Sequence, residues 1–372
     1  MRTHLGSQYD GIAMSEMLPR IDATRGRPRD VGRSDSKRKE TIRSSIAVGL
    51  AILLSIVPTA VRAEPSILDW NAIVNPILSY PDRMLKDPAV AYRDGFFHFF
   101  CSTRFAEPHN GPVPFYRSRD LVTFEECYDE NLADGVGSPD VFLHDDRYVM
   151  VFQKSVPGSD DPDYRRLFYS TSADLLTWTE RKPLAHELHP TLRCIDATVA
   201  FDHGRYVLGY KAWQVFHVAE SASLDGPWSE PVRAWPGGEF DWAENYQFVS
   251  IDGTWRMIAT ARPPVGWPKP SFVNDYVGQH EPFLYTIGGD GSELLHWTRW
   301  TAKTHLAVPI EGWNEIMHAN SATIVDLRAV DGHFYLFYAG ANDGETFDGR
   351  GHGKIGVARS RDLVAWDMPG GE

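Results

Sequence analysis

Five segments of the chain each begin with a polar or acidic residue that leads into an apolar strand. Four carboxyl groups and one imidazole in equivalent places are groups that can move protons in general acid–base catalysis. Taken singly, an Asp before a strand is most often a turn former or a cap. Because all five occupy the same place in a repeat, we expect them to share one site: Asp87, Asp140, Asp196, Glu244 and His318.

The order of these residues along the chain indicates their roles, provided that the five strands line one axis. Asp196 and Glu244 open neighbouring units, so a second carboxylate would keep a proton on Glu244 near neutral pH and suit it to be a general acid. Asp87 would lie across the channel, ionised, as a base or nucleophile. Two carboxyl groups in separate environments that flank a gap are typical of glycoside hydrolysis.

The elements that must position these residues form a fivefold repeat. Each unit reads as a strand, a short turn such as Asp94-Gly95, and a bulkier strand. A Ser/Asp turn and an aromatic residue then follow, which predicts a hairpin between two outer strands, at residues 117–124, 171–178, 223–228, 291–297 and 360–366. Repeats of this kind are typical of propeller blades. The sequence therefore predicts an all-β fold, a five-bladed β-propeller with four-stranded blades, as a single domain over residues 64–372.

Residues 1–63 read as an N-terminal extension that ends in a secretory signal peptide. Basic residues 37–39 precede the apolar run 46–60, and residues 61–63 (Val-Arg-Ala) end it with small residues at the positions that signal peptidase requires. The alternative is a transmembrane anchor, but the run is shorter than the ~20 residues of a span and contains Pro58. We expect cleavage after Ala63, a secreted or periplasmic protein, and no stable membrane insertion.

The net charge limits the classes of molecule that the protein can bind, and the number of cysteines bears on its disulfides. Of 37 Lys/Arg and 50 Asp/Glu, residues 1–63 hold 11 and 6, so the remaining chain carries 26 and 44, a formal charge of −18. Such a surface repels nucleic acid and anionic lipid, and it suits a neutral ligand. The three cysteines are an odd number, so the fold does not depend on disulfides. We expect a carbohydrate partner and a monomer.

The chain resembles the five-bladed propeller glycoside hydrolases, above all glycoside hydrolase family 43, with some likeness to family 62. The resemblance covers about residues 82–368 and rests on Lys-Asp-Pro at 86–88, Ser-Pro-Asp-Val at 138–141, Cys-Ile-Asp at 194–196 and Trp-Ala-Glu-Asn at 242–245. It implies that Asp87 is the general base and Glu244 the general acid. It also implies that Asp196 orients the acid and tunes its protonation, with Asp140 near the substrate. The implied activity is that of an inverting α-L-arabinofuranosidase, β-xylosidase or arabinanase.

Other residues bear on the substrate and on a metal. Family 43 usually has Glu-Gly-Pro at the acid, whereas this chain has Glu-Asn-Tyr at 244–246, which is closer to family 62. The family's blade-five His can hold a structural Ca²⁺ through water, so His318 is a candidate metal ligand, or else a sugar contact or an internally paired side chain. No cofactor is expected to be required. Further candidates for substrate binding, by stacking or hydrogen bonding, are Trp213, Trp242, Asn245, Arg262 and Asn320.

Three other functions fit parts of the pattern. A retaining fructan hydrolase of family 32 also has acids on blades one and four, but its Asn-Asp-Pro-Asn-Gly signature is absent at Asp87. A phosphorolytic enzyme needs a basic cluster for phosphate, and we expect none near the ring. A non-catalytic sugar-binding propeller would not need Asp87, Asp196 and Glu244 together. The sequence therefore favours a hydrolase and leaves the sugar, the linkage and exo or endo action open.

Overall fold

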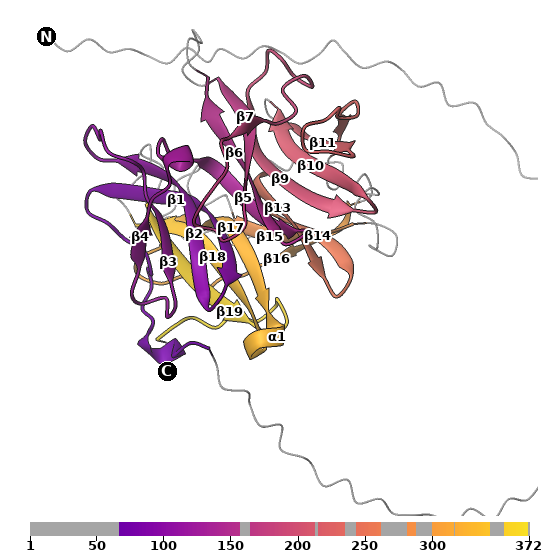
Figure 1. Cartoon of the computed structure of the whole chain (residues 1–372). Helices are drawn as coiled ribbons and strands as arrows, with labels where there is room; N and C mark the ends of the chain where they lie inside the picture. Colours follow the sequence, from indigo (N-terminus) through magenta and orange to yellow (C-terminus); the bar gives the residue numbers. More distant parts are fainter. Residues whose placement is uncertain are drawn as a thin grey trace, which may run out of the picture. The chain divides into compact units, whose positions relative to one another are not determined.

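The computed structural model describes residues 67–156, 164–212, 215–234, 243–261, 281–287, 300–315, 317–342 and 353–370. Its strands form five antiparallel sheets (Figure 1). Blade one holds β1 (Arg83–Arg93), β2 (Phe96–Phe105), β3 (Phe115–Ser118) and β4 (Glu125–Cys127). Blade two holds β5 (Gly137–His144), β6 (Arg147–Ser155), β7 (Arg165–Ser172) and β8 (Lys182–Pro183). Blade three holds β9 (Cys194–Asp202), β10 (Arg205–Ala212), β11 (Val215–Ser221) and β12 (Val232–Arg233).

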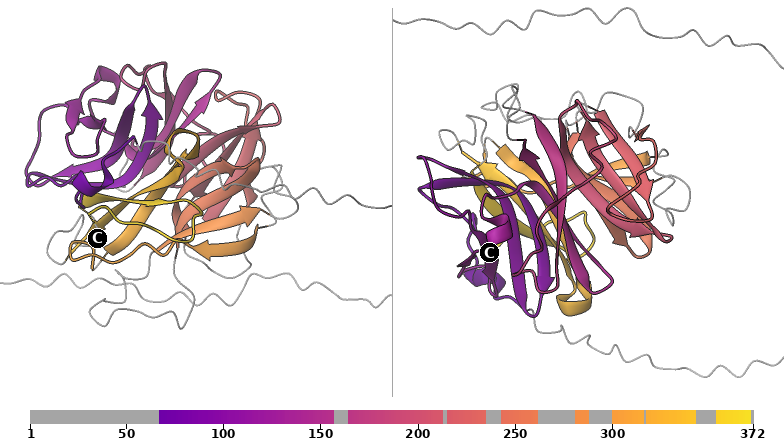
Figure 2. Two further views of the ribbon diagram at one scale, coloured as in Figure 1. Left: turned by 90° about the horizontal axis from the view of Figure 1, so that it is seen from below. Right: turned by 45° about the horizontal axis from the view of Figure 1, so that its top comes forward.

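Blade four holds β13 (Ala243–Ile251), β14 (Thr254–Ala261), β15 (Glu281–Ile287) and β16 (Trp300–His305), and blade five holds β17 (Met317–Leu327), β18 (His333–Ala341) and β19 (Lys354–Ser360). Single-turn 3₁₀ helices lie at Trp70–Ala72 and Glu130–Leu132. The innermost strands β1, β5, β9, β13 and β17 contact one another in that order, and β17 contacts β1, so the ring is closed (Figure 2). This confirms the predicted five-bladed propeller. Blade five differs from the prediction because its sheet has three strands among the described residues.

Turn residues explain where most innermost hairpins reverse. At Asp94-Gly95 and Asp252-Gly253 both residues have positive φ, a conformation that glycine and aspartate adopt at low cost in two-residue hairpins. Blade five departs from the predicted two-residue turn. There the single-turn helix α1 (Arg328–Asp331) follows β17, and Gly332 at φ 82° ends it in the left-handed conformation.

The Ser/Asp signature forms the predicted turn after β3. The Ser118 hydroxyl oxygen accepts a hydrogen bond from the Leu121 backbone N–H at 2.8 Å, and Asp120 Oδ1 accepts from the Val122 and Thr123 N–H groups at 2.9 and 2.7 Å. The same bonds recur around Ser172/Asp174 and Ser360/Asp362. The turn is therefore encoded by side chains that satisfy backbone donors. The blade-four copy at 291–297 lies outside the described residues.

Residues before the first blade close the ring on its last sheet. Leu78 exchanges two backbone hydrogen bonds with Ile355 of β19, at 3.2 and 3.0 Å. The Asn75 side chain donates to the Val357 carbonyl at 2.9 Å and accepts from its N–H at 2.9 Å, as a strand backbone would. The lead-in segment thus occupies part of the fourth-strand place of blade five. Trp70 of this segment is buried, and its indole N–H donates to the Met368 carbonyl at 3.2 Å.

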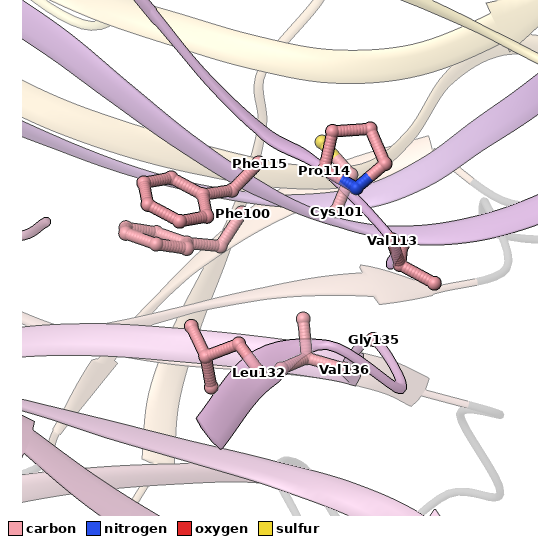
Figure 3. Close-up of a pocket in the computed structure, with 8 residues that line it drawn as sticks. All are labelled: Phe100, Cys101, Val113, Pro114, Phe115, Leu132, Gly135 and Val136. Atoms are coloured by element: carbon pink, nitrogen blue, oxygen red, sulfur yellow. The ribbon is translucent and has the colours of Figure 1, made fainter. Parts of the chain in front are cut away.

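Aromatic side chains fill the spaces between blades. Phe97 and Phe99 of β2 pack edge-on against Phe337 of β18, with centroids 5.7 and 5.1 Å apart. Between blades one and two, Phe100 and Phe115 stack at 5.1 Å beside a small cavity (Figure 3). Its lining carries no carboxyl group, so the cavity is a feature of core packing, lined by Phe100, Cys101, Val113, Pro114, Phe115, Leu132, Gly135 and Val136.

The predicted signal peptide and extension, residues 1–63, lie outside the described residues. In the described ranges, every helix is too short or too polar to cross a membrane. Cys101, Cys127 and Cys194 are free thiols, two of them buried.

Candidate active site

Each innermost strand contains a bulge at which one residue has a left-handed backbone conformation. A non-glycine residue in this conformation costs of order 1 kcal/mol, and Asp and Asn tolerate it best. Because the feature recurs on every blade, these positions are structurally equivalent. We call them the axial ring: Asp87 (φ 50°), Ser138 (39°), Asp196 (53°), Asn245 (56°) and Ser321 (52°).

The axial ring differs from the ring expected from the sequence. Asp87 and Asp196 belong to it, inside their strands rather than ahead of them. Glu244 lies one residue before the ring position of its blade, Asp140 two residues after, and His318 three residues before. A bulge adds an unpaired residue to its strand and shifts the register of the residues before it, so counting back from each apolar run could not locate the ring position. The missed signal is the Asp, Asn or Ser that tolerates positive φ.

Asp87 is the hub of the site. Its carboxylate is 4% exposed. The hydroxyl groups of Ser102 and Ser138 donate to Oδ2 at 2.7 and 3.2 Å. The Ser321 hydroxyl and the Asn245 amide donate to Oδ1 at 2.7 and 3.0 Å. An ionised carboxylate only accepts hydrogen bonds, so four donors from blades one, two, four and five complement an ionised Asp87.

Asp196 is the buried carboxyl group on blade three. Burial is the main reason that its pKa rises from 3.8 to about 6, and the carboxylates of Glu244 and Asp87 add to the rise. The Lys211 ammonium and a hydrogen bond with Ser138 act in the opposite direction. Asp196 therefore gains a proton at a higher pH than an ordinary aspartate does.

Glu244 is the most accessible of the three carboxyl groups. Its side chain is 31% exposed, and its Oε2 lies 3.2 Å from Nζ of Lys211, which is only 5% exposed. A second lysine, Lys86, has Nζ 3.6 Å from Asp87 Oδ2. Burial opposes its charge, but the carboxylates around it, with Asp87 foremost, raise its pKa. Three carboxyl groups and two ammonium groups thus lie close together near the starts of the innermost strands.

Two lysines therefore lie where the sequence analysis expected no basic cluster. Lys86 precedes Asp87 in the chain, but Lys211 comes from the far end of β10 and reaches the site only through the fold. A lysine inside the apolar run 207–212 was a signal in the sequence. The hydroxyl groups of Ser102, Ser138 and Ser321 were also missed, because serine is common in turns and strands.

Asp140 joins blades two and three instead of facing Asp87. Burial raises its pKa to about 7, while a 2.7 Å hydrogen bond from the Thr198 hydroxyl to Oδ2 works against the rise. Thr198 in turn accepts from the Phe248 N–H of blade four at 2.9 Å. These contacts join blades two, three and four, and contact of Asp140 with a substrate stays a prediction.

His318 forms a buried ion pair away from the axial ring. Its Nδ1 lies 2.7 Å from Glu281 Oε1, and its Nε2 lies 3.1 Å from the Glu315 carbonyl oxygen. Burial opposes the charge on the imidazole, but the Glu281 carboxylate raises the pKa of His318. Both ring nitrogens thus have protein partners. Among the described residues, no three His, Cys, Asp or Glu side chains gather as a metal site, and calcium at His318 stays a prediction.

The remaining substrate-binding candidates divide into two groups. Asn245 is a member of the axial ring, and Asn320 is buried beside it, with its amide group in contact with the Ser321 hydroxyl group. Trp213, Trp242 and Arg262 lie outside the described residues. Their contact with a sugar stays a prediction.

Comparison with known proteins is informative at the level of structure. No family model matches the chain, and no curated protein matches it. It is similar to a solved structure from the GH130 family of mannoside phosphorylases. That family is described as containing glycoside hydrolases that target β-1,2-mannosidic linkages in Candida mannan. That alignment has a TM-score of 0.58 and 14% identity, and it covers 80% of this chain and 95% of the other.

Two further structures match over similar lengths. A thermostable family-43 glycoside hydrolase has a TM-score of 0.53 and 15% identity, with 78% and 96% of the two chains covered. The α-L-arabinofuranosidase PaAbf62A from Podospora anserina, solved with cellotriose, has a TM-score of 0.53 and 16% identity, with 80% and 96% covered. At this level of identity the likeness concerns the fold. It confirms at that level the resemblance to the family 43 and family 62 propellers.

Proposed function

We propose that this protein is an inverting glycoside hydrolase that acts on arabinose- or xylose-containing plant-type polysaccharides or oligosaccharides. The observation that carries the proposal is the gathering of Asp87, Asp196 and Glu244 near the starts of the innermost strands, with only Glu244 substantially exposed. Likeness to solved structures of a family-43 hydrolase and an α-L-arabinofuranosidase supports the substrate class.

In this proposal Glu244 is the general acid. Its exposed carboxyl group is the one that a glycosidic oxygen entering the channel can reach. The Lys211 ammonium holds Oε2, so the transferable proton sits on Oε1. Asp196, buried beside it, disfavours a second negative charge and so helps Glu244 to keep its proton.

Asp87 is the general base and activates the attacking water. Its four donors would have to leave an acceptor site for that water. The Ser138 hydroxyl makes the longest of the four bonds, at 3.2 Å, and also hydrogen-bonds Asp196. A rotation of this hydroxyl toward Asp196 frees one acceptor position on Oδ2 for water, while Ser102, Ser321 and Asn245 hold the carboxylate in place.

Two rivals have specific support. The first rival is phosphorolysis, because Lys86 and Lys211 are cations of the kind that bind phosphate. Each of these lysines already lies against a carboxylate, however, which favours hydrolysis. A propeller that binds carbohydrate without cleaving it is the second rival. It would leave unexplained the burial of two carboxyl groups beside a third, which is costly for stability.

The test is an activity screen of residues 64–372 on nitrophenyl α-L-arabinofuranoside, nitrophenyl β-D-xyloside, arabinan and arabinoxylan, with and without phosphate. We expect sugar release without phosphate, a loss of about 10²-fold or more in Glu244→Gln, and proton NMR signals of an inverted first-formed anomer. The control is Glu125→Gln, an exposed carboxylate paired with Arg117 at 2.7 Å on the outer strands. Phosphate-dependent release, a retained anomer, or binding without turnover would each contradict the proposal.

We also propose that the enzyme is exported to the periplasm or the medium. The support is the basic, apolar and small-residue order of residues 37–63. Mass spectrometry of the protein from its native host should give a mature chain that starts at Glu64. A mature chain that retains residues 46–60 would contradict export with cleavage.

A further inference from the structure

A repeated contact links each blade to the next at the height of the axial ring. In blades one, two and four, a side chain on the second strand accepts a hydrogen bond from the N–H of the next blade's ring residue. The three bonds are Ser138 N–H to Ser102 at 2.8 Å, Asp196 N–H to Gln153 at 3.0 Å and Ser321 N–H to Thr260 at 2.7 Å. These acceptors hold the strained bulges in register.

Lys211 stands at the same position of blade three. Strand pairing matches Ser102, Gln153 and Thr260 to the residue just before each axial-ring residue, and it matches Lys211 to Ile195 in the same way. Blade five has Ala339 there. A lysine ammonium has three donors and no acceptor, so Lys211 cannot make the contact that its counterparts make.

Lys211 instead directs a buried charge at Glu244. Lys211 is only 4% exposed. An ammonium group buried to this degree is strongly unfavourable unless a counter-charge pairs with it. The counter-charge is Glu244 Oε2 on the next blade, 3.2 Å from Nζ. The same ammonium stabilises the charged form of Asp196. Of the two blades that depart from the pattern, blade three is the one whose residue at this position contacts the proposed acid.

We propose that Lys211 is a positioning residue that fixes the carboxyl group of Glu244 for proton donation and confines activity to acidic pH. This inference rests on the proposed function. Through Oε2 the ammonium orients the carboxyl plane, so that Oε1 faces the substrate oxygen. Because it also favours the ionised form of Glu244, the proton needed for catalysis is lost at a lower pH than it would be without Lys211.

Among the described residues, the other charged groups around Glu244 do not cancel this effect. From β1 it faces Lys86 and Asp87, and from β9 it faces Asp196. On its own strand β13 the buried Tyr246 hydroxyl donates to the Ala243 carbonyl at 2.6 Å and stays neutral, since burial raises its pKa well above 10. The two carboxylates favour a proton on Glu244 and the two lysines oppose it, so removal of Lys211 shifts the balance toward the protonated form.

The test compares Lys211→Met, Lys211→Gln and Lys211→Arg. An opposite charge within ~4–6 Å shifts a carboxyl group by about 1–3 pH units, and partial exposure of Glu244 favours the lower end. We expect Met and Gln to move the alkaline limb of the pH–rate profile upward by about one unit, and Arg to leave it in place. Gln retains a donor, so its maximal rate should exceed that of Met. Lys154→Met is the matched control, a lysine on β6 bonded to the carbonyls of Asp134 and Gly135.

A second measurement does not depend on activity. Glutamate labelled with ¹³C at the side-chain carboxyl group, with the Glu244 signal assigned through Glu244→Gln, gives its titration midpoint by NMR. We expect the midpoint to rise by about one unit in Lys211→Gln and to stay unchanged in Lys154→Met. An unchanged midpoint in folded Lys211→Gln overturns the inference even if the enzyme is active. A shifted midpoint in a protein that cleaves no glycoside supports the electrostatic coupling and refutes the proposed function instead.

Discussion

Replacing Asp196 with Asn should stabilise the protein while disabling it. The folded state raises the pKa of Asp196 from 3.8 to about 6, chiefly through burial. One pKa unit corresponds to 1.36 kcal/mol, so an ionised Asp196 weakens folding by up to about 3 kcal/mol at pH 7. Asn is nearly the same size and carries no charge. We therefore expect Asp196→Asn to raise the free energy of unfolding at pH 7 by about 1–3 kcal/mol.

The pH dependence of this gain follows from the direction of the shift. Below pH 3.8 the carboxyl group is protonated in both folded and unfolded chains, so the variant has no advantage. Between pH 4 and pH 6 the unfolded chain ionises first, and wild-type stability falls relative to that of the variant. Above pH 6 the difference is constant. Urea unfolding of both proteins at pH 4, 5, 6 and 7 should show the gain growing across this window.

A matched control separates this effect from a general loss of negative charge. Asp146 is exposed and also has a left-handed backbone, at φ 60° against 53° for Asp196, so Asn fits both positions equally well. Asp146→Asn should leave the pH dependence of stability unchanged. If Asp196→Asn gains no stability at pH 7, the carboxyl group does not carry the burial penalty and the reasoning fails. The variant should also lose about 10²-fold or more in rate and shift the alkaline limb of its pH–rate profile downward.

Two further predictions concern contacts that join blades. Asp87→Asn turns an amide N–H₂ toward two of the four donors, so we expect the free energy of unfolding to fall by about 1–3 kcal/mol along with the loss of activity. Unchanged stability by urea unfolding would argue against the role of Asp87 as the hub. Asn75→Ala leaves the Val357 N–H and C=O unpaired, and we expect a loss of about 1–3 kcal/mol in the same assay. The neighbouring Val74→Ala, at a side chain that is 72% exposed, should have almost no effect.

The features that sequence could predict are those encoded by local chemistry. Two-residue turns such as Asp94-Gly95 are recognisable in the sequence, because few residues adopt positive φ at low cost. These turns located the hairpins of four blades. The Ser/Asp turns are equally local, since Ser118 and Asp120 bond to backbone groups at most three residues away. Repetition of these signals was enough to predict a five-bladed propeller.

The candidate site was predictable only where it coincided with such signals. Asp87 and Asp196 were placed correctly because the acid itself occupies the bulge, whereas on blade two the bulge holds Ser138 and Asp140 lies beneath it. Lys211 was missed for a different reason. Its partner Glu244 is 33 residues away on the next blade, and strand periodicity contains no information about which side chains of two neighbouring blades meet. The pairing of charges around Asp87 therefore required the three-dimensional structure.

The seam at which the ring closes has a consequence for how the chain folds. Asn75 and Val357, joined by two hydrogen bonds, are separated by 282 positions in the sequence. During synthesis the first four blades are complete before β19 exists, so their ring must wait open with the edges of blades one and four exposed to solvent. Contacts between such distant residues form slowly, because the entropy of closing so long a loop is lost before the contact is gained. We therefore expect the last step of folding to be the docking of the lead-in segment on β19, and a nascent chain stalled before residue 354 to be the species most prone to aggregate.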